Sequence, residues 1–124
     1  GRYFAIESLN AQDGKPYDAI AELVLLDADL KPLSATGWTI SSVDSEETER
    51  EDGSAGNAID GQTANYWHTQ WGSASPNHPH CLIVDLGKSE TIGGFRYTPR
   101  QGDANVGGRI KDYRIYVGDK LKPR

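Results

Sequence analysis

The sequence has no methionine, a single cysteine and fewer basic than acidic residues. Cys81 has no second cysteine to pair with, which excludes a scaffold held by internal disulfides. With 13 Lys and Arg against 18 Asp and Glu, the net charge of −5 provides no broad positive surface for nucleic acid or an anionic membrane. No apolar run approaches the roughly 20 residues of a membrane span. We therefore expect neither nucleic acid nor a membrane as a partner.

The 124 residues also contain no signal peptide and no recognisable catalytic motif. G-x-S-x-G, H-E-x-x-H and the glycine-rich phosphate loops are all missing, and His68 beside a Ser or Tyr is no catalytic set on its own. The leading Gly1 and the lack of methionine indicate a piece of a longer protein, with any targeting signal outside it. The length suits one domain. We expect a binding module and not an enzyme.

Strand-like alternation of apolar and polar residues is the main periodic signal. It predicts strands within residues 2–9, 21–29, 37–45, 81–87, 91–99 and 109–119. Residues 18–25 are the one segment that could form a helix instead. Because no helices alternate with these strands, the pattern predicts an all-β, antiparallel β-sandwich. Two long loops, 53–80 and 100–108, are the expected places for function, and the acidic stretch 44–56 is expected to be a solvated loop.

Two segments offer metal-binding side chains. His78, His80 and Cys81 in "NHPHC", with His68, could suggest zinc, but strand alternation sends His80 and Cys81 to opposite faces. We therefore expect the histidines of this segment to be surface residues or turn caps. "NAIDGQTAN" offers Asp60, Asn65 and backbone carbonyls, oxygen ligands that suit calcium. An Asp-Gly turn without an ion explains that segment equally well.

Aromatic and polar side chains on the long loops are of the types that bind sugars. Sugars need planar hydrogen-bonding groups together with an aromatic ring for their apolar face. His68, Trp71 and Arg100 supply these types. Simple packing remains the alternative for Trp71, and it is the preferred interpretation of Trp67.

Three linked segments carry a family resemblance. "NAIDGQTANYWHTQW", "HCLIVDLGKSETIGGFRYTPRQG" and "GGRIKDYRIYVGD", within residues 57–119, resemble in order and spacing the coagulation factor V/VIII type C, or discoidin-like, domains. Among these, they resemble the family 32 carbohydrate-binding modules. The resemblance implies a galactose-binding-domain-like jelly-roll β-sandwich. Residues 1–33 resemble the family's closing strands and 38–119 its main body, so 1–124 is expected to be one domain, circularly permuted or cut in a shifted frame.

The resemblance also implies a structural calcium ion. Its expected ligands come from the loop and from the closing strand, and they are Ala21, Glu22, Asn57, Asp60, Gln62 and Asn65. Gln62 is expected to act through its backbone carbonyl. From the residues alone, Glu22 would be an exposed strand carboxylate, so its role as a ligand rests on the resemblance.

Sugar-binding members of this family use residues that match His68, Trp71 and Arg100, with Glu51 and Asn105 on loops that often add polar contacts. The implied function is a non-catalytic module that binds galactose-type or uronic-acid-containing glycans weakly and targets a parent enzyme, a glycoside hydrolase or polysaccharide lyase. The implied location is extracellular, periplasmic or on the cell surface. The alternative is an adhesion domain for protein or phospholipid, which the lack of exposed Leu, Phe or Met at the loop tips disfavours.

Overall fold

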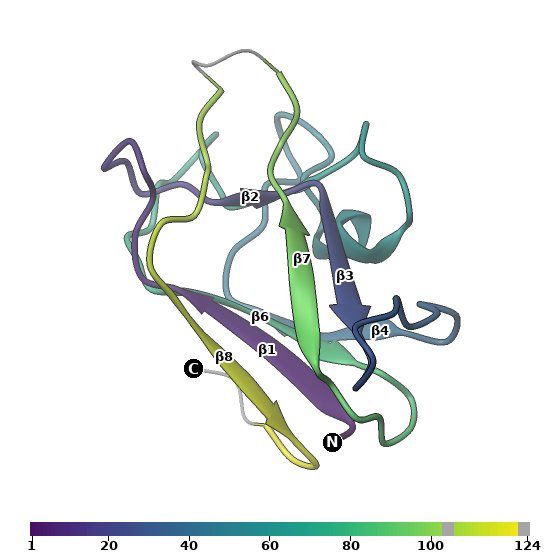
Figure 1. The fold of residues 1–124 in the computed structure, drawn as a ribbon. Helices are drawn as coiled ribbons and strands as arrows, with labels where there is room; N and C mark the ends of the chain where they lie inside the picture. The colour runs from purple at the N-terminus through teal and green to yellow at the C-terminus, as the bar shows by residue number, and fades with distance from the viewer. Residues whose placement is uncertain (103–105, 122–124) are drawn as a thin grey trace.

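The computed structural model describes residues 1–102 and 106–121. Its elements are nearly all strands, joined by turns and long loops (Figure 1). In chain order they are β1 (Tyr3–Ser8), β2 (Ala19–Ile20), β3 (Glu22–Leu26), β4 (Thr39–Val43), the short 3-10 helix η1 (Ala55–Ile59), β5 (Trp67–His68), β6 (His80–Asp85), β7 (Gly94–Thr98) and β8 (Tyr113–Gly118). Each of the six predicted strand segments overlaps an observed strand.

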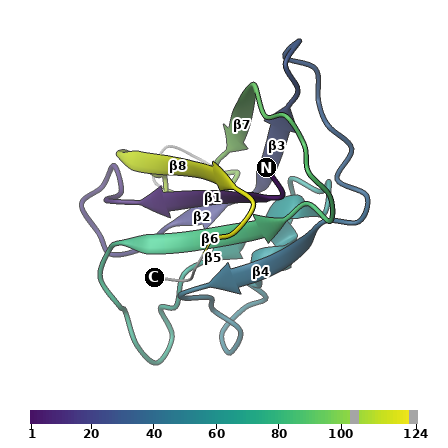
Figure 2. The same cartoon turned by 90° about the horizontal axis from the view of Figure 1, so that it is seen from below.

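A four-stranded antiparallel sheet forms one layer, in the order β4-β6-β1-β8 (Figure 2). β1 lies between β6 and β8, so a strand from the first 33 residues holds a central place in the main sheet. Alternation along β1 sends Phe4 and Ile6 to one face and Ala5 to the other, where Ala5 packs with Cys81 and Ile83. A register shift of one residue would reverse these faces, so apolar burial fixes the pairing.

The second layer contains the antiparallel pair β3 and β7, which stands across the larger sheet in Figure 1. The short pair β2 and β5 forms a separate two-stranded sheet. Phe4 of the first layer meets Phe95 of the second with their ring centroids 6.0 Å apart. The core between the layers contains Phe4, Ile6, Ile20, Leu23, Leu25, Trp67, Leu82 and Val84. The predicted all-β antiparallel sandwich is confirmed.

Residues 18–25 form strands and not a helix. Leu23 and Leu25 are both buried, while Val24 between them is only half-buried, which is the two-residue period of a strand. β3 pairs with β7 along its whole length, from Glu22 opposite Thr98 to Leu26 opposite Gly94. Tertiary pairing therefore decides a segment whose local sequence allows both structures. Among the described residues, no helix has the length and apolar character needed to cross a bilayer.

Candidate functional site

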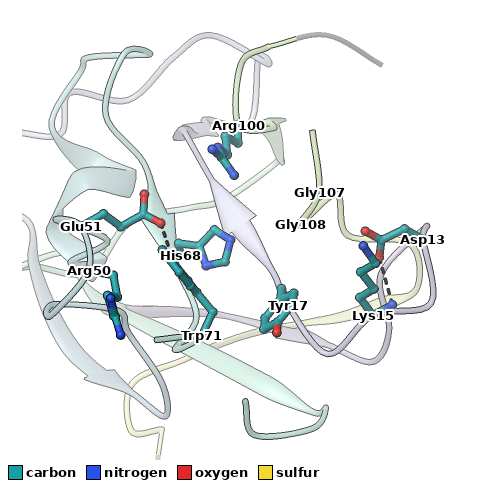
Figure 3. A pocket seen from close by; sticks show the side chains of 10 residues that line it. All are labelled: Asp13, Lys15, Tyr17, Arg50, Glu51, His68, Trp71, Arg100, Gly107 and Gly108. Carbon is teal, nitrogen blue, oxygen red and sulfur yellow. Dashed lines mark hydrogen bonds between the residues drawn. The ribbon is translucent and has the colours of Figure 1, made fainter. Parts of the chain in front are cut away.

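Loops of the chain surround a pocket of about 420 Å³. Four separate stretches of chain line it: the turn after β1, the acidic stretch, the segment around β5, and the loop between β7 and β8 (Figure 3). The lining residues are Asp13, Lys15, Tyr17, Arg50, Glu51, His68, Trp71, Arg100, Gly107 and Gly108. A concave site with charged, aromatic and backbone groups converging on it is the usual form of a small-ligand site.

His68 forms the floor of the pocket and is 5% exposed. It ends β5, which pairs with β2, so its backbone position is fixed by sheet hydrogen bonds. Its Nδ1 lies 2.6 Å from the carbonyl oxygen of Thr69. Because a carbonyl only accepts, Nδ1 carries the proton, and in the neutral ring Nε2 is left as an acceptor. Tyr17 flanks the ring, with centroids 5.8 Å apart.

Trp71 forms one wall and is 38% exposed, much more than the buried Trp67. Its indole Nε1 donates to Glu51 Oε2 at 2.7 Å, as Figure 3 shows. The other oxygen of Glu51 accepts the hydroxyl of Tyr66. Burial, and then this hydrogen bond, raises the pKa of Tyr66 and keeps it a donor. Both oxygens of Glu51 are thus engaged in holding aromatic side chains.

Arg100 lies across the pocket from Trp71, after β7. Its guanidinium carbon is 4.8 Å from the centroid of the Tyr66 ring, a cation–π contact. Tyr66 therefore links Glu51 to Arg100. The guanidinium is held against a ring, which leaves its planar edge available to oxygens of a ligand.

Glu47 holds together the two loops that carry these groups. Its Oε2 accepts the backbone N–H groups of Glu49 and Arg50, each at 2.9 Å. Its Oε1 accepts those of Trp71 at 2.9 Å and Gly72 at 2.6 Å. The side chain is buried, and these donors lower its pKa to about 2. A carboxylate with four backbone donors fixes the Trp71 backbone relative to the acidic stretch.

Gly72 is required next to this carboxylate. A Cβ atom at Gly72 would lie 3.0 Å from Glu47 Oε1 and 2.5 Å from the Cγ of Arg50. The expectation that residues 44–56 form a merely solvated loop is wrong, because Glu47 within this stretch is buried. Burial of Glu47 is possible because its charge is satisfied by backbone N–H groups, which hydropathy does not reveal.

The predicted calcium ligands Glu22 and Asp60 lie beside each other. Glu22 begins β3, while Asp60 follows η1. Gly61 N donates to Glu22 Oε1 at 3.1 Å, and Asp60 accepts Gln62 N at 2.8 Å and Asn65 Nδ2 at 3.1 Å. Burial, opposed by the Gly61 hydrogen bond and reinforced by the Asp60 carboxylate, raises the pKa of Glu22 to about 7. Two adjacent carboxylates from separate elements are an oxygen donor set that fits a hard cation.

The remaining predicted calcium ligands surround this pair less directly. The amide of Asn57 donates to the backbone carbonyls of Asp52 and Tyr66 at 2.9 and 3.3 Å, so its side chain braces the loop. Asn65 reaches Asp60 through its amide. Ala21 donates its N–H to Thr98 O, and Gln62 donates its N–H to Asp60. Of the residues predicted to bind sugar, the structure brings His68, Trp71, Arg100 and Glu51 into one pocket, and Asn105 lies outside the described residues.

The histidines of "NHPHC" differ from expectation. His80 is fully buried, and His78 is half-buried with its Nε2 3.0 Å from Asp18 Oδ2. The prediction that they are surface residues or turn caps is wrong, because Asp44 and the carbonyl of Pro16 both lie 2.8 Å from the nitrogens of His80 and make its burial possible. Cys81 does face the other side of the sheet, as the alternation predicts.

Six of the ten lining residues were not predicted from the sequence. The turn between β1 and β2 carries the lining residues Asp13, Lys15 and Tyr17. This turn is not one of the two long loops in which function was expected. Arg50 lies in the acidic stretch. The Asp13-Gly14 pair, where Gly14 has a φ of +75°, is a turn signal in the sequence, but a turn signal alone does not indicate a pocket.

The fold is a β-sandwich with a pocket among its loops. The F5/8 type C domain family matches residues 38–122, more than half of the sequence. The chain therefore belongs to this family.

Three curated relatives are similar to this chain in sequence. It is 51% identical over 86 residues to a sialidase of Micromonospora viridifaciens, 36% over 88 residues to an A type blood N-acetyl-alpha-D-galactosamine deacetylase of Flavonifractor plautii, and 30% over 86 residues to a galactose oxidase of Gibberella zeae. The matches cover 68%, 71% and 68% of this chain, but only 13%, 11% and 12% of those proteins.

Proposed function

We propose that this domain is a non-catalytic carbohydrate-binding module whose pocket takes a galactose-type or uronic acid residue of a glycan. The observation that carries the proposal is the convergence of His68, Trp71 and Arg100 on one pocket. They supply an acceptor nitrogen, an exposed ring and a planar cationic donor, the three groups that a pyranose ring can use.

Each group has a separate part in the proposed complex. His68 Nε2 accepts a hydrogen bond from a sugar hydroxyl, because Nδ1 donates to the carbonyl oxygen of Thr69. Arg100 donates two hydrogen bonds to neighbouring oxygens, or to the carboxylate of a uronic acid. Trp71 stacks on the apolar face of the sugar. Glu51 acts by holding the Trp71 indole and not as the primary contact, since both its oxygens already have donors.

The proposed module also binds a structural calcium ion. Glu22 and Asp60 would hold it through their carboxylates, with Ala21, Asn57, Gln62 and Asn65 as the additional predicted ligands. The ion would neutralise the adjacent carboxylates and tie the start of β3 to the loop after η1. It has no chemical step in this function.

We infer further that the module targets a parent enzyme to its glycan. The matched segment is a small part of relatives named as a sialidase, a deacetylase and a galactose oxidase, which supports a modular parent with other domains. A glycan ligand and such a parent favour an extracellular, periplasmic or cell-surface location. A shallow site with one stacked ring predicts a Kd on the order of tens of micromolar to millimolar.

Calorimetric titration with methyl galactoside and with galacturonate tests the proposed ligand. Wild type should bind at least one of them, and Trp71→Ala and Arg100→Ala should each weaken binding at least about tenfold. Arg2→Ala is the matched control, because Arg2 also lies over a tyrosine ring, at 5.5 Å from the centroid of Tyr3, but outside the pocket. The site is wrong if wild type binds neither sugar, or if both pocket variants bind as well as Arg2→Ala.

A further inference from the structure

A second group of metal-binding side chains lies at the start of β6. Asp18, His78 and His80 each present a ligand atom, and these atoms all lie within 4.8 Å of one another. The His78 and His80 rings have centroids 4.7 Å apart. Asp18 and His80 are fully buried, and the His78 side chain is 12% exposed. Two imidazoles and one carboxylate are therefore enclosed together beneath the segment that enters β2.

The buried carboxylate of Asp18 indicates that this cluster binds a cation. Both its carboxylate oxygens are buried, and within the described residues neither accepts a hydrogen bond of normal geometry, although the side chains of His78 and Ser8 lie near enough to favour its charged form. His78 Nε2 is 3.0 Å away, but it is not aligned as a hydrogen bond and is itself without a partner within that described part. Burial of a carboxylate without donors is costly, and native proteins satisfy such groups with donors, water or a cation.

The surroundings of His80 resemble those of a metal ligand. Its Nδ1 lies 2.8 Å from Asp44 Oδ2, and Asp44 is itself fixed because its Oδ1 accepts the N–H of Cys81 at 2.7 Å. Histidines that bind metals commonly donate their other N–H to a carboxylate in this way. Its Nε2 lies 2.8 Å from the carbonyl oxygen of Pro16, which only accepts, so Nε2 carries a proton in the metal-free protein. Binding of a metal at Nε2 therefore requires the loss of this proton and of the contact with Pro16.

We propose that Asp18, His78 and His80 form a site for a divalent transition-metal ion, of which zinc suits the donor set best. Two imidazole nitrogens and one carboxylate oxygen are typical zinc ligands, whereas calcium prefers oxygen alone. The site is thus chemically different from the Glu22 and Asp60 pair. It excludes Cys81, which lies on the opposite face of β6.

Zinc at this site would stabilise the part of the pocket around Tyr17 and His68. Asp18 follows the pocket residue Tyr17, and its backbone N–H donates to the hydroxyl of Thr69 at 3.0 Å, next to His68. A metal that joins Asp18 to β6 would tie the turn between β1 and β2 to the main sheet. The proposal does not depend on the pocket binding a sugar.

Calorimetric titration of chelator-treated protein with zinc tests the site. Wild type should bind one zinc ion per chain, and its thermal midpoint should rise with zinc. His78→Gln should weaken zinc binding more than about a hundredfold, while Asp44→Asn, which removes only the orienting carboxylate, should weaken it about tenfold. Cys81→Ser should bind zinc as wild type does.

One further variant distinguishes zinc binding at this cluster from zinc binding at the calcium pair, and the choice of His78 as the main variant avoids a loss of folding. Glu22→Gln should keep full zinc affinity, which distinguishes the cluster from the proposed calcium site. Because Asp18→Asn removes a fully buried charge and can impair folding, the partly exposed His78 is the main variant. Folded wild type that binds no zinc near pH 7 would show an Asp18 and His78 ion pair only and would overturn the proposal. Equal loss of zinc affinity in Cys81→Ser and His78→Gln would overturn it as well.

Discussion

Glu47 and Glu22 are two glutamates whose surroundings are opposite. Glu47 receives four backbone N–H donors, and its pKa falls to about 2. Glu22 receives one such donor, from Gly61, and its pKa rises to about 7 because of its burial first and of the neighbouring Asp60 carboxylate second. Backbone donors satisfy the charge of Glu47, whereas burial and a neighbouring carboxylate oppose the charge of Glu22.

The difference separates two ways of fixing a loop. Backbone donors make Glu47 a permanent part of the fold, independent of any ion. At Glu22 and Asp60 the like charges oppose each other until a cation joins them, so this part of the structure should respond to calcium. Changes at the two glutamates should therefore have distinct and unequal effects.

Replacement of Glu47 should have the largest effect. Glu47→Ala removes the shared acceptor of four N–H groups, including that of Trp71, so the pocket wall loses its position. We expect the thermal midpoint to fall and Kd for the bound glycan to weaken at least about a hundredfold. Glu49→Gln is the control, because Glu49 is an exposed neighbour that contributes only its backbone to the cluster. Similar glycan affinities in the two variants would contradict this role.

Calcium should produce the next largest effect. At a free concentration a hundredfold above its Kd, calcium should stabilise the fold by about 2.7 kcal/mol, measured as a higher thermal midpoint. Glu22→Gln should abolish this response, and Glu47→Gln should retain it even though that variant is less stable. If calcium leaves the wild-type melting curve unchanged after metal removal has been verified, the proposed calcium response of Glu22 and Asp60 is wrong.

The pH dependence of stability should show the lowered pKa of Glu47. A group with a depressed pKa in the folded state stabilises fully above its unfolded value, near 4.5, and loses that contribution as pH falls towards 2. The stability difference between wild type and Glu47→Gln should therefore be constant above about pH 5.5, one unit above that value, and shrink below pH 4.5. Urea unfolding of both proteins at about pH 7, 4 and 2 measures it. A difference that does not change with pH would show that Glu47 acts only through packing.

The smallest effect should come from Glu51, whose two oxygens accept side-chain donors and not backbone ones. Glu51→Gln retains one acceptor oxygen, so Trp71 or Tyr66 loses its hydrogen bond. We expect Kd for glycan to weaken about fivefold, equivalent to one hydrogen bond, with little change in thermal midpoint. A thermal midpoint lowered as much as in Glu47→Ala would contradict the distinction between backbone and side-chain anchoring.

Strands could be predicted from sequence, because short apolar runs such as residues 81–84, whose two faces pack in separate clusters, are typical of buried strands. The polar anchors could not. Glu47 has an acidic, loop-like neighbourhood, and its burial depends on N–H groups about 25 residues away in sequence. Asp18 and His78 meet only through the fold, which local spacing does not encode.

Only the part of the pocket that lies in the segments resembling the family could be predicted from the sequence. Its aromatic and cationic groups, Trp71 and Arg100, carry the family resemblance, whereas Asp13, Lys15 and Tyr17 enter from a turn that the resemblance does not mark. Tyr66 is half-buried between Glu51 and Arg100, and its role in linking them is revealed only by the geometry.

The three tryptophan indoles allow the most direct test of the central claim that the loop pocket binds a sugar. Trp71 donates to Glu51 in the pocket, Trp67 donates to the Ser45 carbonyl in the core, and Trp38 lies outside the pocket. In a ¹⁵N-labelled sample titrated with methyl galactoside or galacturonate, the Trp71 indole N–H signal should shift and saturate while the Trp38 and Trp67 signals stay in place. A Trp71 signal that neither sugar moves would contradict the account.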